Sequence, residues 1–170
     1  MNFAILRYFN VSGSDPDIET GEDHNPETHL IPSIIETGFG LRSELKIFGN
    51  DYDTPDGTCI RDYVHVTDLI EGHIRAFEYI GEKDILVNLG NGKGFSVLEV
   101  IKAAESVLKK KIHFLISSRR AGDPAVLISD TKKAQDLIGW NPKFTDINTQ
   151  IQHLFDWMIK RKGLIVERTS

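Results

Sequence analysis

The sequence predicts an α/β fold in which a few strands of a parallel sheet are combined with helices. Two unbroken apolar runs, one at 3–6 and one within 84–89, are typical of strands that are buried on both faces of a parallel sheet. Segments with helical spacing of apolar residues or with capping signals follow these strands. The expected helices cover 29–39, 67–80, 96–109, 130–137 and 147–159.

Length and composition describe an ordinary globular protein. At 170 residues, with 40% hydrophobic and 26% charged residues, the chain suits one domain or part of a larger one. A net charge of -5 argues against nucleic acid or anionic lipid as a partner. Cys59 is the single cysteine, which excludes an intrachain disulfide and fits a reducing compartment. No apolar run approaches the roughly 20 residues of a membrane span, and no signal peptide is evident, so we expect a cytoplasmic protein.

The first forty residues predict a strand, a long loop and a helix. The strand covers 2–10, and the acidic loop 11–28 is longer than usual, which is typical of a functional segment but also fits a plain connector. The helix 29–39 has Thr28 as a candidate cap. Its free N–H groups could hold a phosphate with help from His29, although a lone histidine beside a loop is more often only solvated.

The central stretch places an arginine, Arg61, where a loop becomes ordered structure. A short strand at 45–48 ends in Phe48, which could pack under a flat ligand or cover the core. The acidic turn residues of 51–57 then lead into a strand or turn at 59–66, followed by a helix capped by Thr67 or Asp68. Arg61 at this junction is suited to grip a phosphate or carboxylate with two hydrogen bonds. The alternative is an ion pair between Arg61 and Asp62 or another local acid.

The glycines after the strand at 84–89 resemble a dinucleotide loop only superficially. Counting G-x-G-x-x-G from Gly90 places Phe95 where the third glycine belongs, and the next strand, 112–116, ends in Ser117 instead of an acid. We therefore interpret 90–94 as a structural turn. The turn 119–124 carries two arginines and an acid, which could hold a phosphate and a sugar hydroxyl or form an ordinary charged turn. The tail 161–170 is expected to fray.

Several kinds of catalytic chemistry lack support in the sequence. The six histidines show no HExxH spacing, so we expect no metal site. There is no GxSxG motif, and Cys59 has no obvious base nearby in sequence. What remains is a set of anion-binding and aromatic groups that are spread over several loops. They predict a binding surface, and we name no catalytic residue.

Five motifs closely resemble the C-terminal half of the UDP-glucose 4-epimerases, which belong to the extended short-chain dehydrogenase/reductase family. They are LRYFN at 6–10, GEDHNPETHLIP at 21–32, IFGNDYDTPDGTCIRDYVHVTDL at 47–69, NLGNGKGFSVLEVI at 88–101 and RRAGDPAVL at 119–127. The resemblance implies a partial NAD(P)-binding Rossmann-like fold, with 1–170 as the C-terminal substrate-binding portion. It implies UDP-glucose and UDP-galactose as substrates in galactose metabolism, interconverted through an NAD-dependent 4-keto intermediate.

The resemblance also implies a role for individual residues. The diphosphate would be contacted by Asn10, His29, Arg61 and Arg120. The uracil pocket would be lined by Lys46, Ile47 and Phe48, and Asp123 would bind the ribose. Leu127 would limit bulkier N-acetylated sugars, and the nicotinamide would be flanked by Tyr8 and Phe9.

Two family motifs are missing from this sequence. No GxxGxxG loop is present, and the single Tyr-x-x-x-Lys match, Tyr79 with Lys83, lies at an expected helix end and is treated as chance. We therefore expect the chain alone to be inactive. Because strands of the sheet would lack neighbours, we expect self-association or a need for the missing N-terminal half. The alternatives are a non-catalytic nucleotide-sugar binding module and part of a related sugar-nucleotide dehydratase or epimerase.

Overall fold

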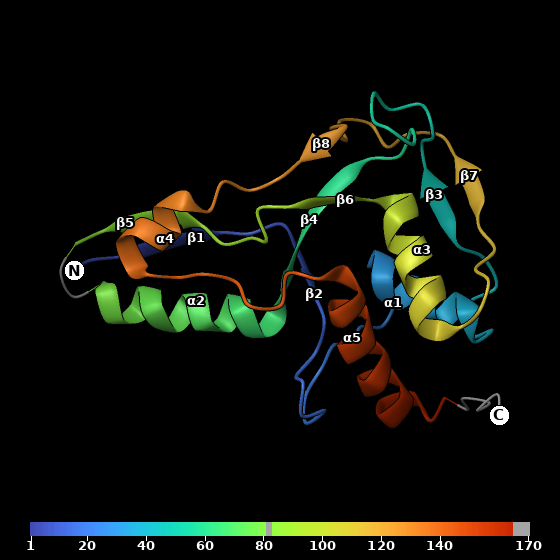
Figure 1. The fold of residues 1–170 in the computed structure, drawn as a ribbon, viewed down its shortest axis with the longest axis horizontal. Coiled ribbons are helices and arrows are strands. Elements are labelled where there is room, and N and C mark those ends of the chain that lie inside the picture. The colour runs from blue at the N-terminus through green and yellow to red at the C-terminus, as the bar shows by residue number, and fades with distance from the viewer. Residues whose placement is uncertain (81–82, 165–170) are drawn as a thin grey trace.

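The chain folds into an elongated α/β structure, seen here in a computed structural model that describes residues 1–80 and 83–164 (Figure 1). The strands are β1 (Ala4–Arg7), β2 (Asn10–Ser12), β3 (Lys46–Phe48), β4 (Ile60–His65), β5 (Ile85–Asn88), β6 (Gly94–Ser96), β7 (Leu115–Ser117) and β8 (Val126–Leu127). The helices are α1 (Leu30–Gly38), α2 (Val66–Tyr79), α3 (Val97–Leu108), α4 (Lys132–Ile138) and α5 (Ile147–Lys162). Among these helices, none combines the length and the apolar content that a bilayer span requires.

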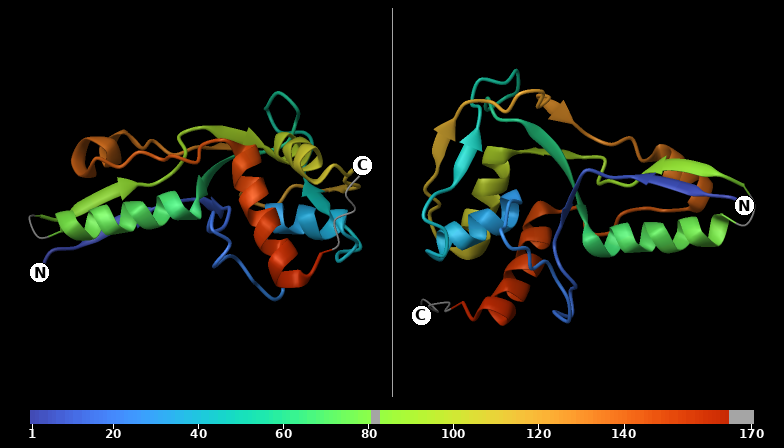
Figure 2. Two further views of the ribbon diagram at one scale, coloured as in Figure 1. Left: turned by 60° about the horizontal axis from the view of Figure 1, so that its bottom comes forward. Right: turned by 180° about the vertical axis from the view of Figure 1, so that it is seen from behind.

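The elements form two groups that β4 connects (Figures 1 and 2). One group pairs β1 with β5 in parallel and places α2 and α4 beside them, around a small core that includes Leu89 and Trp140. The other group places α1, α3 and α5 to one side of the parallel pair β3–β7, around a larger core. Between them, β4 pairs in parallel with β2 and β8 and antiparallel with β6. The predicted α/β class with parallel strands is thus confirmed.

The N-terminal apolar run forms two strands instead of the predicted single one. β1 pairs with β5, whereas β2 belongs to the sheet of β4, and Tyr8 and Phe9 lie between them. The expectation that these strands are buried on both faces is wrong, since Ile5 is 44% and Leu86 is 37% exposed. The opposite face is covered, because Val87 lies in the core beside α2 and α4. The apolar runs therefore predicted where the strands lie, but not how many faces of each strand are covered by other parts of the chain.

Two predicted helix caps differ in the structure. His29, not Thr28, is the N-cap of α1, and its side chain makes no capping hydrogen bond. His65, not Thr67 or Asp68, caps α2, because the Thr67 N–H donates to His65 Nδ1 at 3.1 Å. Asp68 is used elsewhere: its carboxylate accepts the N–H groups of residues 143 and 144 and so ties the segment after α4 to α2.

Helical spacing predicts one apolar side of α2 with Leu69, Ile70, Ile74, Phe77 and Ile80, and the structure buries only part of it. Leu69 is buried, but Ile70, Ile74 and Phe77 are 53%, 50% and 79% exposed. The buried side of α2 is made by Leu69 together with the small residues Gly72 and Ala76. The helix therefore carries a second, uncovered apolar stripe.

The C-terminal part holds most predicted elements with small shifts. The strand expected at 112–116 is β7, three residues later at its start, and the short strands β6 and β8 were not predicted. The tail was expected to fray from 161, yet α5 continues to Lys162 and Arg161 pairs with Asp23 at 2.6 Å. The rest of that expectation, over 165–170, lies outside the described residues.

Candidate functional site

Five of the residues singled out in the sequence lie together at the β4–β8 edge. We call this set the arginine cluster; its members are Phe48, Arg61, Arg120, Asp123 and Leu127. The β4–β8 register pairs Arg61 with Leu127, and Phe48 ends the neighbouring strand β3. The turn 119–124 brings the other two residues back to the end of β4, so segments remote in sequence meet at one edge.

Arg61 is held in place by an acid, but not by its sequence neighbour. Its guanidinium pairs with Asp123, and it also donates to the carbonyl oxygens of Ile60 and Pro124, each at 2.7 Å. The Arg61 side chain is only 11% exposed. The ion pair is thus formed with an acid 62 residues away in the sequence, not with Asp62 or another local acid, and it fixes the guanidinium in one orientation. A fixed fork is also what bidentate anion binding requires.

The second arginine of the cluster stacks on an aromatic ring. The guanidinium of Arg120 lies over the ring of Phe48, 4.0 Å from its centroid. The remaining predicted uracil contacts sit on the same strand: Lys46 pairs with Glu44 at 2.8 Å, and Ile47 is 2% exposed. Because the Ile47 side chain is buried, a ligand contact at this position would use backbone atoms.

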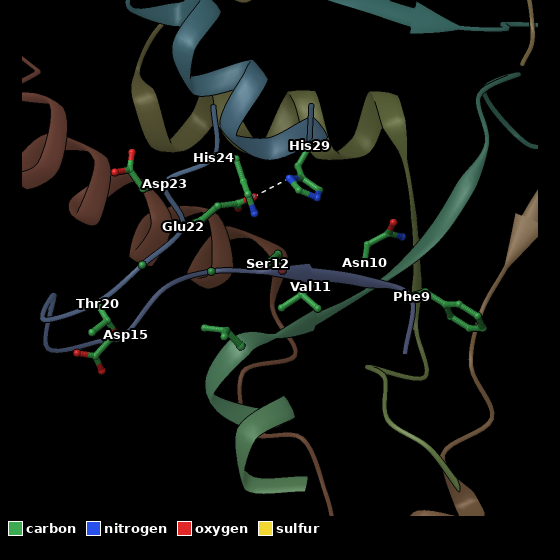
Figure 3. Close-up of a pocket in the computed structure, with 13 residues that line it drawn as sticks. Phe9, Asn10, Val11, Ser12, Asp15, Thr20, Glu22, Asp23, His24 and His29 are labelled. Atoms are coloured by element: carbon green, nitrogen blue, oxygen red, sulfur yellow. Dashed lines mark hydrogen bonds and ion pairs between the residues drawn. The ribbon is translucent and has the colours of Figure 1, made fainter. Parts of the chain in front are cut away.

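The other predicted residues line a separate cavity of about 780 Å³ (Figure 3). Phe9, Asn10 and His29 contribute to its wall, along with β2 and the loop that follows it. Tyr8 lies outside this lining set, next to His73, with ring centroids 5.8 Å apart. The diphosphate and nicotinamide contacts of these residues are what the family resemblance implies, and they stay predictions.

Strand pairing connects the cavity to the arginine cluster. Asn10 is opposite Tyr63 in the parallel β2–β4 register, and its Nδ2 donates to the Asp62 carbonyl at 3.1 Å. Side chains alternate along a strand, so Arg61 and Tyr63 project from the same face of β4, the face that Asn10 shares. Tyr63 itself is 5% exposed and belongs to the larger core, so packed residues rather than open surface connect the two regions.

Asp62 organises the backbone around the cluster, and sequence analysis missed this role. Its carboxylate is 1% exposed and accepts the N–H groups of Asn91 (2.7 Å), Gly92 (3.1 Å) and Ser129 (3.1 Å). The predicted structural turn at 90–94 is an irregular connection that ends where Gly94 begins β6. A Cβ on Gly90 would lie 1.8 Å from Ser129 Oγ and 2.7 Å from Asp62 Oδ2. Its glycine serves close packing against Asp62 rather than phosphate binding.

The ionisable groups beside the cluster favour their neutral forms. Burial raises the pKa of the Cys59 thiol despite the opposing effect of Arg61 nearby. Burial also raises the pKa of Tyr52, and the negative charge of Asp123 adds to that effect. The Tyr52 hydroxyl is buried without a hydrogen-bond partner among the described residues, while the guanidinium of Arg119 lies 4.1 Å from its ring centroid. A neutral thiol and a neutral phenol suit binding better than nucleophilic chemistry.

Comparison with known proteins assigns this arrangement to a family. Residues 1–90 match the model of the NAD dependent epimerase/dehydratase family, and the chain belongs to that family. Within it, the chain is similar to UDP-glucose 4-epimerases. It is 46% identical over 159 residues to the enzyme of Halalkalibacterium halodurans and 42% identical over 160 residues to that of Rhizobium meliloti.

Solved structures agree with the sequence comparison. A crystal structure of UDP-glucose 4-epimerase superposes with a TM-score of 0.90 at 44% identity, covering 98% of this chain and 51% of that one. The enzyme from Bifidobacterium longum, in complex with NAD+ and UDP, superposes with a TM-score of 0.89 at 37% identity, over 96% of this chain and 49% of that one. Both curated relatives are covered over 48% of their own length, and 92–93% of this chain takes part. The chain therefore spans about half the length of the relatives it matches, and the predicted Rossmann-like class is confirmed.

Proposed function

We propose that this chain is the C-terminal, substrate-anchoring half of a UDP-glucose 4-epimerase. In this proposal the intact enzyme interconverts UDP-glucose and UDP-galactose through an NAD-dependent 4-keto intermediate. The observation that carries the proposal is the arginine cluster, with one arginine oriented by a carboxylate and another stacked on Phe48.

The cluster suits a nucleoside diphosphate for a physical reason. Two guanidinium groups at one edge supply N–H donors for a diphosphate. Arg61 would use the N–H groups that its contacts with Asp123, Ile60 and Pro124 leave free. The Phe48 ring offers an apolar surface for a flat base, and the Asp123 carboxylate can accept a ribose hydroxyl. An epimerase must hold the nucleotide firmly while the hexose turns over, so strong contacts belong on the diphosphate. Asn10 and His29 would complete the diphosphate contacts from the cavity side.

The second part of the proposal concerns what the chain would need for chemistry. The sequence contains no GxxGxxG loop and no Tyr-x-x-x-Lys pair near the cluster. We propose that these come from an N-terminal half, which would dock on the uncovered face of β1–β5 and the exposed stripe of α2. Both surfaces are apolar, as the 44% exposure of Ile5 and the 79% exposure of Phe77 indicate. Residues Tyr8 and Phe9, 43% and 38% exposed, would then flank the nicotinamide.

Calorimetric titration of the chain with UDP tests the anchoring role. We expect saturable UDP binding that weakens at least tenfold in Arg120→Ala and in Arg61→Lys, which keeps the charge but loses the fork. Arg119→Ala is the matched control, because its side chain pairs with Asp51 and lies over Tyr52, outside the cluster. NAD alone should not bind.

Two outcomes would contradict the anchoring role. One is UDP binding that the Arg61 and Arg120 substitutions leave unchanged; the other is a folded chain that does not bind UDP even when fused to an NAD-binding half. Binding of NAD by the chain alone would refute the proposal that the NAD site belongs to the N-terminal half.

A further inference from the structure

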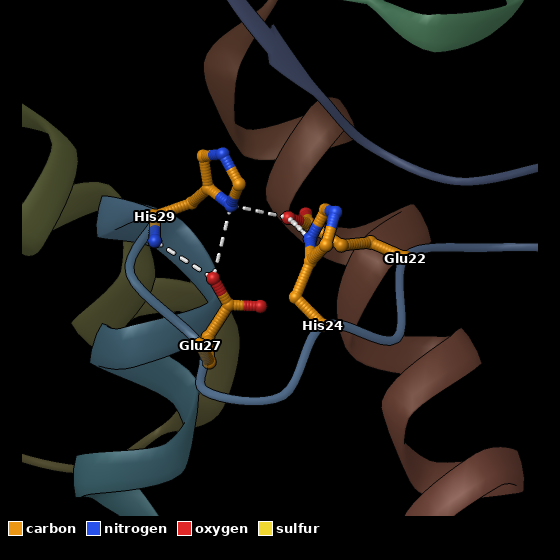
Figure 4. A group of neighbouring side chains, drawn as sticks. All are labelled: Glu22, His24, Glu27 and His29. Atoms are coloured by element: carbon orange, nitrogen blue, oxygen red, sulfur yellow. Dashed lines mark hydrogen bonds and ion pairs between the residues drawn. The ribbon is translucent and has the colours of Figure 1, made fainter.

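Four potential metal ligands converge where the loop after β2 enters α1 (Figure 4). They are Glu22, His24, Glu27 and His29, and their ligand atoms all lie within 4.8 Å of one another. His29 Nδ1 lies 2.6 Å from Glu22 Oε1 and 3.0 Å from Glu27 Oε1, while His24 Nδ1 lies 2.8 Å from the same Glu22 oxygen. We call this set the Glu/His cluster.

The charge of the cluster is unbalanced when its histidines are neutral. The side chains of Glu22 and Glu27 are only 17% and 6% exposed, so water screens them poorly. In the part of the chain that the structure describes, their ion pairs are with His24 and His29. The nearby cations are engaged elsewhere: Arg161 with Asp23, and both Arg42 and Lys162 with Glu36.

The backbone that carries these ligands is anchored on several sides. Glu27 Oε1 accepts the N–H groups of Thr28 and His29, each at 2.7 Å, and the Glu27 carbonyl accepts from Arg42 at 2.7 Å. The Glu22 carbonyl accepts the indole N–H of Trp157 in α5 at 2.9 Å. Such outer contacts hold metal ligands in position and are a usual part of built sites.

From this geometry we propose that the Glu/His cluster binds one divalent first-row transition-metal ion of the zinc type. Two imidazole nitrogens and two carboxylate oxygens form a donor set that zinc accepts in four-coordinate sites. Ligand atoms around such an ion are about 3.4 Å apart, given metal–ligand distances of about 2.1 Å. The present separations, from 2.6 Å up to at most 4.8 Å, lie on both sides of that spacing.

An ion here would have a path from solvent and a structural effect. Glu22, His24 and His29 line the 780 Å³ cavity, so the cluster opens to it (Figure 3). The ion would cross-link Glu22 and His24 of the loop to Glu27 and His29 at the start of α1. These side chains now meet only through ion pairs and hydrogen bonds. It would bind His29 through Nδ1 and leave Nε2 as a donor, so the site does not compete with the diphosphate contact proposed for His29.

This inference goes beyond the proposed function and departs from the expectation of no metal site. The ligand spacing E-x-H-x-x-E-x-H matches no familiar motif, so the sequence alone gave no reason to suspect a site. The loop geometry, not the spacing, brings the four groups together. None of the arginine-cluster residues takes part in it.

Cobalt titration of the chelator-treated chain tests the site, because Co²⁺ replaces zinc and its visible absorption reports coordination. We expect saturation at one ion per chain, displacement by Zn²⁺, and binding at least tenfold weaker in His24→Gln and Glu22→Gln. His113→Gln is the control, since His113 is an exposed histidine outside the cluster. Circular dichroism of each metal-free variant checks the fold, and Glu22→Gln carries the test if His24→Gln is misfolded.

The proposal is overturned if the folded chain shows no saturable binding, or if both cluster variants bind as tightly as the parent. In that case the four side chains form only a hydrogen-bonded network that shapes the loop. Failure of UDP binding with intact cobalt binding would count against the proposed function alone.

Discussion

Asp62 is the buried charge on which the geometry of the candidate site rests. Its carboxylate accepts three backbone N–H groups and, at 2.5 Å, the hydroxyl of Ser129. Each buried donor left unpaired costs roughly 1–3 kcal/mol. We predict that Asp62→Ala lowers the free energy of unfolding by more than about 3 kcal/mol.

Urea unfolding followed by circular dichroism measures the effect of this change. Asp62→Asn, which keeps one acceptor oxygen, should lose less stability, and Asp53→Ala in the exposed loop should lose little. A stability of Asp62→Ala equal to that of the parent would show that the turn 90–94 does not depend on the carboxylate.

His65 gives the fold a second residue-scale property, a dependence on pH. Burial, with a smaller effect from His153, lowers the pKa of His65 from 6.5 to about 4. The neutral ring is therefore favoured in the folded state, and its stabilisation is complete above pH 6.5. It is lost as the pH falls from 6.5 towards 4, because over this range His65 of the unfolded chain binds a proton that the folded chain does not bind. Once the folded ring is protonated as well, it loses the Nδ1 acceptor that caps α2.

We expect this titration to cost up to about 3 kcal/mol of unfolding free energy across that pH range. His65→Asn keeps a capping acceptor without the titration, so its stability should fall less steeply with acid. Unfolding curves between pH 7.5 and 4.5 compare the two proteins. Equal slopes would contradict the assignment to His65.

At the scale of elements, α2 shows which surface the chain leaves uncovered. Its buried side uses Leu69 and small residues, whereas Ile70, Ile74 and Phe77 form an exposed stripe. We predict that the parent chain self-associates through apolar surface and that Ile74→Lys with Phe77→Lys raises the monomer fraction. Light scattering after size-exclusion chromatography measures this. Glu71→Lys on the same helix is the control, because it adds positive charge to α2 without removing an apolar side chain; it also breaks the ion pair between Glu71 and Arg75.

A parent chain that is monodisperse and unfolds cooperatively as a monomer would contradict this prediction. Because the substituted residues are exposed, the midpoint of thermal unfolding of the variants should match that of the parent to within a few degrees.

Helices were more predictable than strands for a physical reason. The helix periodicity and caps such as Ser96 with Glu99, which form a capping box, are local signals. β6 and β8 are three and two residues long, and their pairing with β4 depends on segments more than 30 residues away. The prediction that β1 is buried on both faces was wrong because an apolar run shows only that a strand can be buried. Whether it is buried depends on the other elements that cover it.

The same distinction holds for the candidate site as a whole. Side chains with specific chemistry, such as Arg61 and Arg120, could be singled out from the sequence. Their pairing with Asp123 and Phe48 could not be predicted, since these residues approach the arginines only through the β4–β8 edge and the turn between β7 and β8. Asp62 was missed for a related reason: its hydrogen-bond partners come from two remote turns.

On the scale of the whole molecule, an uncovered apolar face and a match to about half of each relative point the same way. Both support the proposal that the chain works with an N-terminal half. The exposed face includes β1, which is paired only with β5 in the described residues. A docked N-terminal half would cover this face and supply the cofactor loop that we propose.

The most direct measurement is epimerase activity of a chimera that joins the N-terminal half of the Halalkalibacterium halodurans relative to residues 1–170. We predict that the chimera binds NAD and converts UDP-galactose to UDP-glucose, that Arg61→Ala in the chimera reduces this activity at least tenfold, and that the chain alone is inactive. A folded, NAD-bound chimera without activity, or turnover by the chain alone, would contradict the account.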